Sequence, residues 1–147
     1  MRISVKGRYA LAAVIAMAQN KSGENIAAVN IANQLGISKI YLEQVFTQLK
    51  KNGILSAVKG SRGGYQLARS PVSVTAWDVL SSLEAALTEV TEATVAENAP
   101  GIEIAMKEVI FTPLDKTIRS FLSGVTVQNL LDTAEKQQAE QAFMLNI

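Results

Sequence analysis

The chain has 147 residues, 48% of them apolar, and contains neither cysteine nor histidine. This length and apolar content suit one small domain, or one domain with an appendage, and exclude wholesale disorder. The missing residue types exclude disulfides, thiolate and imidazole metal ligands, cysteine nucleophiles and histidine bases. No apolar run is long enough to span a membrane, and the N-terminal segment lacks the small-residue cleavage site of a signal peptide. We therefore expect a cytoplasmic protein with no metal or cofactor.

The net charge of +1 conceals a division between a basic and an acidic half. Residues 1–70 carry ten basic and two acidic side chains, a net charge of +8, whereas residues 71–147 carry four basic and eleven acidic ones, a net charge of −7. A basic half is suited to a polyanion such as nucleic acid. The simpler alternative is a chance scatter of solvated surface charge.

Three helices are predicted in the basic half. The first covers residues 7–20, which are rich in alanine and in apolar side chains. The second covers residues 28–35 and ends before Gly36, because glycine favours the left-handed conformation that terminates helices. Ser38 is a suitable N-cap for the third helix, residues 39–52. The side chains that we expect to face the core from this third helix are Ile40, Leu42, Val45, Phe46 and Leu49.

A β-hairpin is predicted after the third helix. Two short strand-like runs, Ile54–Lys59 and Tyr65–Ala68, flank a glycine-rich tip over residues 60–64. Two helices joined by a glycine-containing turn form a helix-turn-helix, and the following hairpin makes it a winged helix. The sequence thus predicts a mainly α protein with a small β-hairpin, in which residues 1–70 form a winged helix-turn-helix DNA-binding domain. The alternative is a small helical domain with an incidental hairpin.

Residues 71–147 are predicted to hold a linker, one helix and a helical dimerisation and regulatory region. The helix covers residues 75–86 and is followed by a polar loop over 88–101. A last helix is expected over 126–141, and the apolar tail 143–147 needs a surface on which to pack. The weak capping box of the first of these helices is formed by Thr75 and Asp78.

An apolar stripe is predicted along the chain from Ile102 onward, because apolar side chains recur there three or four residues apart. Pro113 interrupts the pattern. Either the helix kinks there, or a new helix begins with Thr112 as its N-cap, and the sequence Thr-Pro-Leu-Asp favours the second reading. The stripe could fold back on its own domain, but we expect it to pair with a second copy of the chain. The residues expected to dimerise are Met106, Ile110, Leu114, Ile118 and Phe121.

The third helix is the candidate for base recognition. In a helix-turn-helix, side chains near the start of the second helix reach base edges in the major groove. Glutamine pairs with adenine, lysine reaches guanine and glutamate accepts from cytosine. Glu43 has an alternative role as the ion-pair partner of a nearby lysine. The candidates are Ser38, Lys39, Tyr41, Glu43, Gln44 and Gln48.

Other basic side chains are candidates for contacts with the DNA backbone and the minor groove. A cation on a narrow hairpin tip suits the minor groove, and glycine allows close approach of the backbone to a phosphate. Tyr65 is expected to pack against the third helix rather than on a base. The candidates for phosphate contacts are Lys6, Arg8 and Lys51, and those of the wing tip are Lys59, Ser61, Arg62 and Gly63.

No enzyme is predicted. The chain has no glycine-rich phosphate loop after a strand and no nucleophile elbow, and nothing pairs its carboxylates and hydroxyls into a site. The remaining alternative to a DNA-binding regulator is a protein-interaction module that uses the winged helix as a scaffold.

The chain resembles the Rrf2 family of bacterial winged-helix transcription regulators in three segments, MRISVKGRYALAA, GISKIYLEQVFTQLKKNGILSAVKG and RGGYQLA. The similarity is dense over residues 1–69 and continues more loosely through TAWDVLSSLE and FLSGVTVQNLL. It implies a regulator, by default a repressor, that binds a partly palindromic operator in double-stranded DNA as a homodimer joined through its long C-terminal helix. It also implies base contacts by Ser38, Tyr41, Glu43 and Gln44 and a minor-groove contact by Lys59.

One departure from the family pattern concerns the cofactor. Cluster-binding members hold an iron–sulfur cluster through cysteines in the loop that matches roughly residues 88–105, and this chain has no cysteine. The chain is therefore more similar to the branch of the family without a cluster, which is regulated through a protein partner. A pocket near this loop is an alternative site for a small effector.

Overall fold

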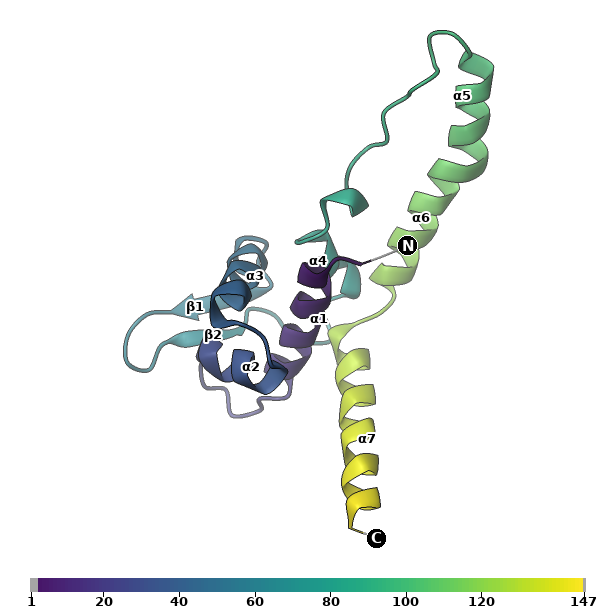
Figure 1. The fold of residues 1–147 in the computed structure, drawn as a ribbon. Coiled ribbons are helices and arrows are strands. Elements are labelled where there is room, and N and C mark those ends of the chain that lie inside the picture. Colours follow the sequence, from purple (N-terminus) through teal and green to yellow (C-terminus); the bar gives the residue numbers. More distant parts are fainter. Residues whose placement is uncertain (1–2, 147) are drawn as a thin grey trace.

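The computed structural model describes residues 3–146 as a mainly helical chain with one two-stranded hairpin (Figure 1). Its first half holds the helices α1 (Val5–Ala18), α2 (Ala28–Leu35) and α3 (Lys39–Lys51) and the strands β1 (Leu55–Val58) and β2 (Gly64–Leu67). Its second half holds α4 (Ala76–Ser81), the 3-10 turn η1 (Ala85–Leu87), α5 (Pro100–Met106), the π-helical segment η2 (Lys107–Phe111), α6 (Thr112–Ser123) and α7 (Val127–Leu145). The predicted fold class, a winged helix-turn-helix followed by C-terminal helices, is confirmed.

Over residues 3–146, none of the helices combines the length and the apolar character needed to cross a membrane.

The core lies where α1, α2 and α3 pack together. Leu42, Phe46 and Leu49 form one face of α3 and are completely buried, together with Ala13 and Val14 of α1. Full burial of a leucine or phenylalanine side chain stabilises a fold by roughly 1.5–3 kcal/mol relative to exposure. This face therefore fixes the orientation of α3 and leaves the opposite face of the helix in solvent.

Ile40 lies outside this core, so the prediction that it faces inward is wrong. Its side chain is 72% exposed. Ile40 precedes the buried Leu42 by two residues, which places it roughly 200° away around a helix of about 3.6 residues per turn. It therefore shares the outward side of α3 with polar residues.

The segments that precede α4 and α7 pair with each other, and both helices pack on the core. Thr75 and Thr126, the residues before these helices, form an isolated β-bridge. The Val127 N–H donates to the Val74 carbonyl at 2.8 Å, and both of these valines are buried. α7 then packs along α1. The acidic half of the chain thus contributes directly to the core of the basic half.

α5, η2 and α6 form one continuous helix from Pro100 to Ser123. The prediction that a new helix begins with Thr112 as its N-cap is wrong, because Phe111 and Thr112 both have helical φ and ψ angles and neither caps a helix. The π-helical segment η2 ends at Phe111, two residues before Pro113. A π turn departs from the regular i→i−4 hydrogen-bond pattern, so the chain accommodates there a proline that has no N–H to donate.

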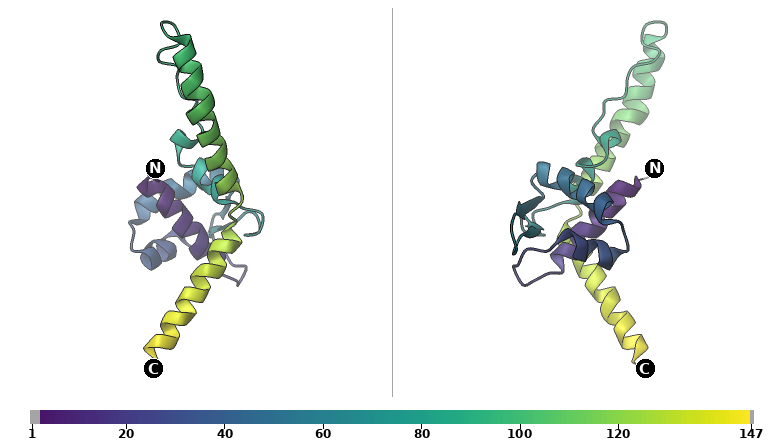
Figure 2. Two further views of the ribbon diagram at one scale, coloured as in Figure 1. Left: turned by 90° about the vertical axis from the view of Figure 1, so that its right-hand side faces the viewer. Right: turned by 60° about the vertical axis from the view of Figure 1, so that its left-hand side comes forward.

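This continuous helix projects from the body, which is formed by α1 to α4 and the hairpin (Figures 1 and 2). α7 extends from the same body in another direction. None of the residues of α5, η2 and α6 is buried. The predicted apolar tail is the end of α7, where Phe143, Met144 and Leu145 are exposed. Ile147, which also belongs to that tail, lies outside the described residues.

Asp78 links α4 to the end of the hairpin. It forms the predicted capping box, in which the Asp78 N–H donates to Thr75 Oγ1 at 3.1 Å and the Thr75 N–H donates to Asp78 Oδ2 at 3.0 Å. Arg69, just after β2, donates to the same carboxylate at 3.1 Å. Burial acts to raise the pKa of Asp78, but the hydrogen bonds with Thr75 and the Arg69 guanidinium outweigh it and hold that pKa below its ordinary value of 3.8.

We predict that Asp78→Asn lowers the free energy of unfolding by about 0.5–1 kcal/mol near neutral pH, because it removes the charge that Thr75 and Arg69 stabilise. A carboxylate with a depressed folded-state pKa stabilises the fold above its unfolded pKa, and this contribution is lost as the pH falls through the folded value. The difference between variant and wild type should therefore close below pH 3.8. Urea unfolding at a series of pH values measures it, and a difference independent of pH would contradict the assignment.

Candidate nucleic-acid interface

The outward face of α3 presents the side chains predicted to reach DNA bases. Ser38 begins the helix by accepting a hydrogen bond from the Tyr41 N–H at 3.0 Å, which confirms it as the N-cap. Since Leu42, Phe46 and Leu49 turn inward, the polar side chains between them turn outward. Among the predicted base-reading side chains, those exposed or half-exposed on this face are Lys39, Glu43, Gln44 and Gln48.

Glu43 forms an ion pair with a nearby lysine, which is the alternative to base recognition predicted from the sequence. Lys39 Nζ lies 3.7 Å from Glu43 Oε1, one helical turn away, and both side chains are about half exposed. An exposed pair of this kind contributes roughly 0–1 kcal/mol, so it opens at little cost. The geometry therefore leaves both side chains accessible to an approaching base.

Tyr41 is half-buried and packs against the first helix. Its ring meets the ring of Tyr9 edge-on, with 5.4 Å between the centroids. This arrangement ties the first turn of α3 to α1 and leaves part of the Tyr41 side chain at the surface.

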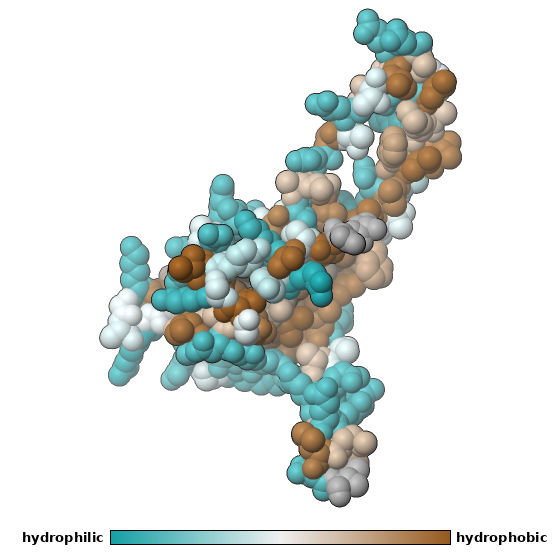
Figure 3. Space-filling view, in the orientation of Figure 1, coloured by the Kyte–Doolittle hydropathy of each residue, from teal (hydrophilic) through white to brown (hydrophobic). Residues whose placement is uncertain are grey.

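The tip of the wing, residues 59–63, is narrow and exposed. β1 and β2 pair antiparallel, with Val58 opposite Gly64 as the last pair. The Gly63 N–H donates to the Gly60 carbonyl at 3.0 Å and closes the turn. The tip forms the left-hand extremity of Figure 1, where Figure 3 shows hydrophilic side chains projecting into solvent. The exposed side chains of the tip are Lys59, Ser61 and Arg62.

The base of the wing is fastened to the body by backbone and ring contacts. Tyr65 exchanges two backbone hydrogen bonds with Ile26, each 2.8 Å long. The Tyr65 ring also meets Phe46 of α3, with 4.7 Å between the centroids, which confirms the predicted packing on the third helix. Asn25 Nδ2 donates to the Arg62 carbonyl at 3.3 Å. These contacts hold the wing at a defined angle to α3.

The three residues predicted to contact phosphates lie apart from one another. Lys6, near the start of α1, borders the same surface hollow as Gln48 of α3. Arg8 is exposed near the start of α1 and Lys51 at the end of α3, and neither forms an ion pair with the described residues. Lys6 therefore borders the candidate base-reading helix, and Lys51 lies on that helix, seven residues after Gln44 and so on the same side.

Sequence reasoning missed two features of this surface. Ile40 and Thr47 are exposed on the outward face of α3, and their spacing of seven residues, about two helical turns, would have revealed that they share a side. Asn25 gave no local signal, because its contact with Arg62 spans 37 residues of chain.

The residues predicted to dimerise lie along the projecting helix. Ile110, Leu114 and Phe121 are 52%, 50% and 69% exposed, respectively. Met106 and Ile118 are partly buried. The stripe thus exposes a large apolar area that the described part of the chain does not cover.

Comparisons with known proteins agree with this arrangement. The sequence profile of the Rrf2 family, described as an iron-dependent transcriptional regulator, matches residues 3–133. The transcriptional regulator IscR of Xenorhabdus nematophila is 31% identical over 147 residues, covering 96% of this chain and 89% of that protein. The structure of CymR, the global cysteine regulator of B. subtilis, matches with a TM-score of 0.73 at 28% identity, covering 90% of this chain and 98% of that one. The structure of T. potens IscR matches with a TM-score of 0.72 at 28% identity, covering 94% and 91%.

The chain belongs to the Rrf2 family and is a DNA-binding transcriptional regulator with a winged helix-turn-helix. The resemblance predicted from the sequence is thereby confirmed. Because this is a family of regulators, the expectation that the chain is not an enzyme is also confirmed.

The iron dependence in the description of the family does not fit the residues of this chain. An iron–sulfur cluster is held by cysteine thiolates, with histidine as an occasional substitute, and the sequence has neither residue. Within residues 3–146, no three carboxylates come together in a group that could hold a metal ion. The chain therefore lacks the ligands that a cluster requires.

We predict that Gly64→Ala detaches the wing from the body. Gly64 has a φ of +143°, and a Cβ at this position would lie 2.6 Å from the Ile26 carbonyl oxygen. The variant should lose about 1–3 kcal/mol of unfolding free energy through backbone strain and displaced hydrogen bonds. Gly101→Ala is the matched control, because no atom lies within 4 Å of its Cβ position in α5. Equal stability of the two variants in urea unfolding would contradict this account.

Proposed function

We propose that the chain is a repressor that binds a partly palindromic operator in double-stranded DNA as a homodimer. In this proposal α3 enters the major groove and the wing tip enters the adjacent minor groove. The observation that carries it is the fastening of the exposed wing tip and the polar face of α3 to one rigid body, through Tyr65. A regulator of this kind acts on the chromosome, which places it in the cytoplasm.

The outward face of α3 supports a role in base recognition. A single α-helix fits the major groove, and its side chains can read the donor and acceptor pattern of the base edges there. Gln44 can pair with adenine, Lys39 with guanine and Glu43 with the amino group of cytosine. A carboxylate near DNA weakens binding overall, so Glu43 contributes to sequence selection rather than to affinity.

The wing tip supports a role in the minor groove. Arg62 and Lys59 stand on a two-stranded hairpin only a few residues wide, and cations on such tips are attracted to the negative potential of a narrow minor groove. Gly63 lies beside them and has no side chain to hold the backbone away from a phosphate. Together these residues provide affinity with little dependence on base sequence.

The projecting helix supports the proposed dimer. Exposed apolar side chains that repeat along one helix face are a typical subunit contact, and two-fold symmetric dimers are the commonest oligomers. The stripe that contains Ile110, Leu114 and Phe121 lies outside the DNA-binding body, so two bodies can be joined without covering either α3 (Figure 2). A dimer of this form matches a palindrome, in which each half-site meets one copy of α3.

Regulation by a protein partner fits the exposed end of α7. Phe143, Met144 and Leu145 would present an apolar surface to such a partner. A pure protein-interaction scaffold, the alternative function, would bind a partner through this surface and show no preference for DNA.

We predict that two groups of substitutions affect DNA binding differently. Arg62→Ala and Lys59→Ala should weaken binding to all sequences and should each lower the slope of log affinity against log salt by about 1, because each removes one phosphate-neutralising charge. Gln44→Ala should change the preferred base instead, at a cost of roughly 1–3 kcal/mol for the original site.

Fluorescence anisotropy with labelled duplexes at several salt concentrations measures both effects. Lys136→Ala, which removes an exposed cation from α7, is the control and should leave the slope unchanged. A wild-type affinity that does not vary with salt would rule out the proposal, because contacts with phosphates require a steep dependence.

We predict that Leu114→Asp converts the protein to a folded monomer, because burying a charge in the apolar stripe is strongly unfavourable for association whereas the side chain is solvated in the monomer. Sedimentation velocity measures the change in mass. Val72→Asp, which alters an exposed apolar residue of the linker, is the control and should remain dimeric. A dimeric Leu114→Asp variant would place the interface elsewhere.

A further inference from the structure

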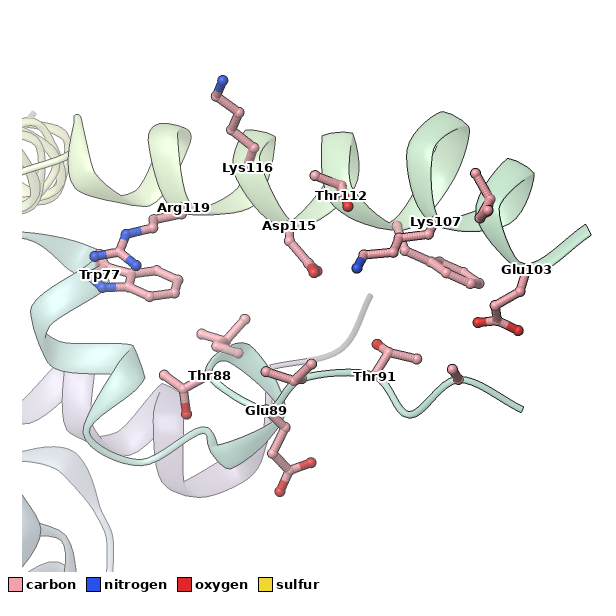
Figure 4. A pocket seen from close by; sticks show the side chains of 15 residues that line it. Trp77, Thr88, Glu89, Thr91, Glu103, Lys107, Thr112, Asp115, Lys116 and Arg119 are labelled. Atoms are coloured by element: carbon pink, nitrogen blue, oxygen red, sulfur yellow. The ribbon is translucent and has the colours of Figure 1, made fainter. Parts of the chain in front are cut away.

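A cavity of about 750 Å³ lies between the projecting helix and the segment that follows η1. The side chains of α5, η2 and α6 form one wall, and residues 87–93 form the other (Figure 4). Trp77 of α4 closes one end, where Arg119 of α6 lies over its ring, 5.1 Å from the centroid. Pockets of this size accommodate small organic molecules.

The cavity is lined by charges of both signs that do not neutralise one another. In Figure 4 the ends of Lys107 and Asp115 converge on the cavity from the same helix, and Arg119 lies at one end of the cavity, over Trp77. Over residues 3–146, none of these three side chains forms an ion pair. A purely anionic ligand would meet the Asp115 carboxylate, and a purely cationic ligand would meet Lys107 and Arg119. A zwitterion satisfies both signs at once.

The rest of the lining is apolar. Leu87 and Val90 contribute from one wall and Ile104 and Phe111 from the other. Val90 and Ile104 are exposed, and a ligand with a hydrocarbon side chain would remove part of their surface from water. The charged and apolar parts of the cavity together match an α-amino acid with an apolar side chain.

The π-helical segment η2 is a second, independent feature of this site. Lys107 and Phe111, its first and last residues, both line the cavity. π-helical turns are rare and occur frequently at functional sites. Four cavity-lining residues each directly follow a residue of the apolar stripe: Lys107, Phe111, Asp115 and Arg119. Successive residues of a helix lie about 100° apart around its axis, so the cavity-lining face and the apolar stripe point in different directions. A ligand in the cavity therefore does not compete with the proposed dimer partner.

We propose that this cavity binds a free α-amino acid with an apolar side chain, which acts as the effector of the regulator. In this assignment Lys107 binds the carboxylate and Asp115 binds the ammonium group. α4 connects the cavity to the wing, because Trp77 lines the cavity and the next residue, Asp78, is paired with Arg69 at the end of β2. Binding of the amino acid to the cavity does not depend on the proposed function, whereas its role as an effector rests on that function.

Trp77 is the only tryptophan in the chain, so its fluorescence reports directly on occupancy of the cavity. The experiment titrates the full-length protein, without DNA, with L-leucine, L-methionine and L-phenylalanine, and calorimetry confirms each binding curve; phenylalanine does not absorb at tryptophan excitation wavelengths. At least one amino acid should give a saturable change. For leucine, the analogues isocaproate and isoamylamine each lack one charge and should bind at least about tenfold more weakly.

The variants Lys107→Gln and Asp115→Asn should also weaken binding by at least about tenfold. Lys116→Gln is the matched control, because Lys116 borders the cavity but its ammonium group points away from it (Figure 4). Circular dichroism verifies that each variant is folded. No saturable binding by any of the three amino acids, equal binding of isocaproate and leucine, or unaltered affinity in both variants would overturn the proposal.

The effector role is tested by measuring the affinity for duplex DNA with and without the bound amino acid. It predicts a change of at least about fivefold, and Asp115→Asn should abolish the response without altering DNA binding in the absence of ligand. Binding to the cavity with no change in DNA affinity would contradict the effector role. Failure of the protein to bind DNA at all would instead contradict the proposed function, and the fluorescence titration keeps the two cases apart.

Discussion

The edge-to-face contact between Phe46 and Tyr65 sets the relation between the two elements that we propose to contact DNA. Phe46 is fully buried at the centre of α3, and Tyr65 belongs to the strand that enters from the wing tip. The Tyr65 backbone is bonded on its other side to Ile26, so the hairpin is held both by the core and by the segment before α2. A recognition helix and a wing can engage neighbouring grooves only if the angle between them is fixed. The fold provides this by placing one aromatic pair at their junction.

The second half of the chain has two kinds of structure with different physical roles. α4 and the beginning of α7 complete the core of the first half, as the buried Val79 and Val127 show. The helix from Pro100 to Ser123 instead extends away from that core with no buried residue of its own. Its apolar stripe and its charged, cavity-lining face are adjacent, which allows a dimer contact and a ligand site on one helix. α4 is the element through which either could act on the wing.

Most of the fold could be predicted from the sequence because its signals are local. The caps at Ser38 and Thr75, the terminating glycine at position 36 and the glycine-rich hairpin tip each depend on a few neighbouring residues. One prediction is wrong although the sequence holds the signal, and the other differences depend on geometry beyond such signals. Ile40 was assigned to the core by its chemical type although its helical position directs it outward, and the π turn before Pro113 has no pattern in the sequence. The contact of Asn25 with the wing joins segments far apart in the chain, so it could not be found before the fold was known. A pocket near residues 88–105 is one of the alternatives that the sequence offers, but its lining by Trp77 and the projecting helix depends on the fold.

We propose that two copies of this basic, winged domain read one two-fold symmetric DNA site. The most direct test selects bound sequences from a random pool of DNA duplexes, with the full-length protein at physiological salt. We expect enrichment of a partly palindromic consensus whose half-sites lie about one helical turn of DNA or a multiple of it apart. Enrichment of a single unrepeated half-site, or no enrichment at all, would contradict it.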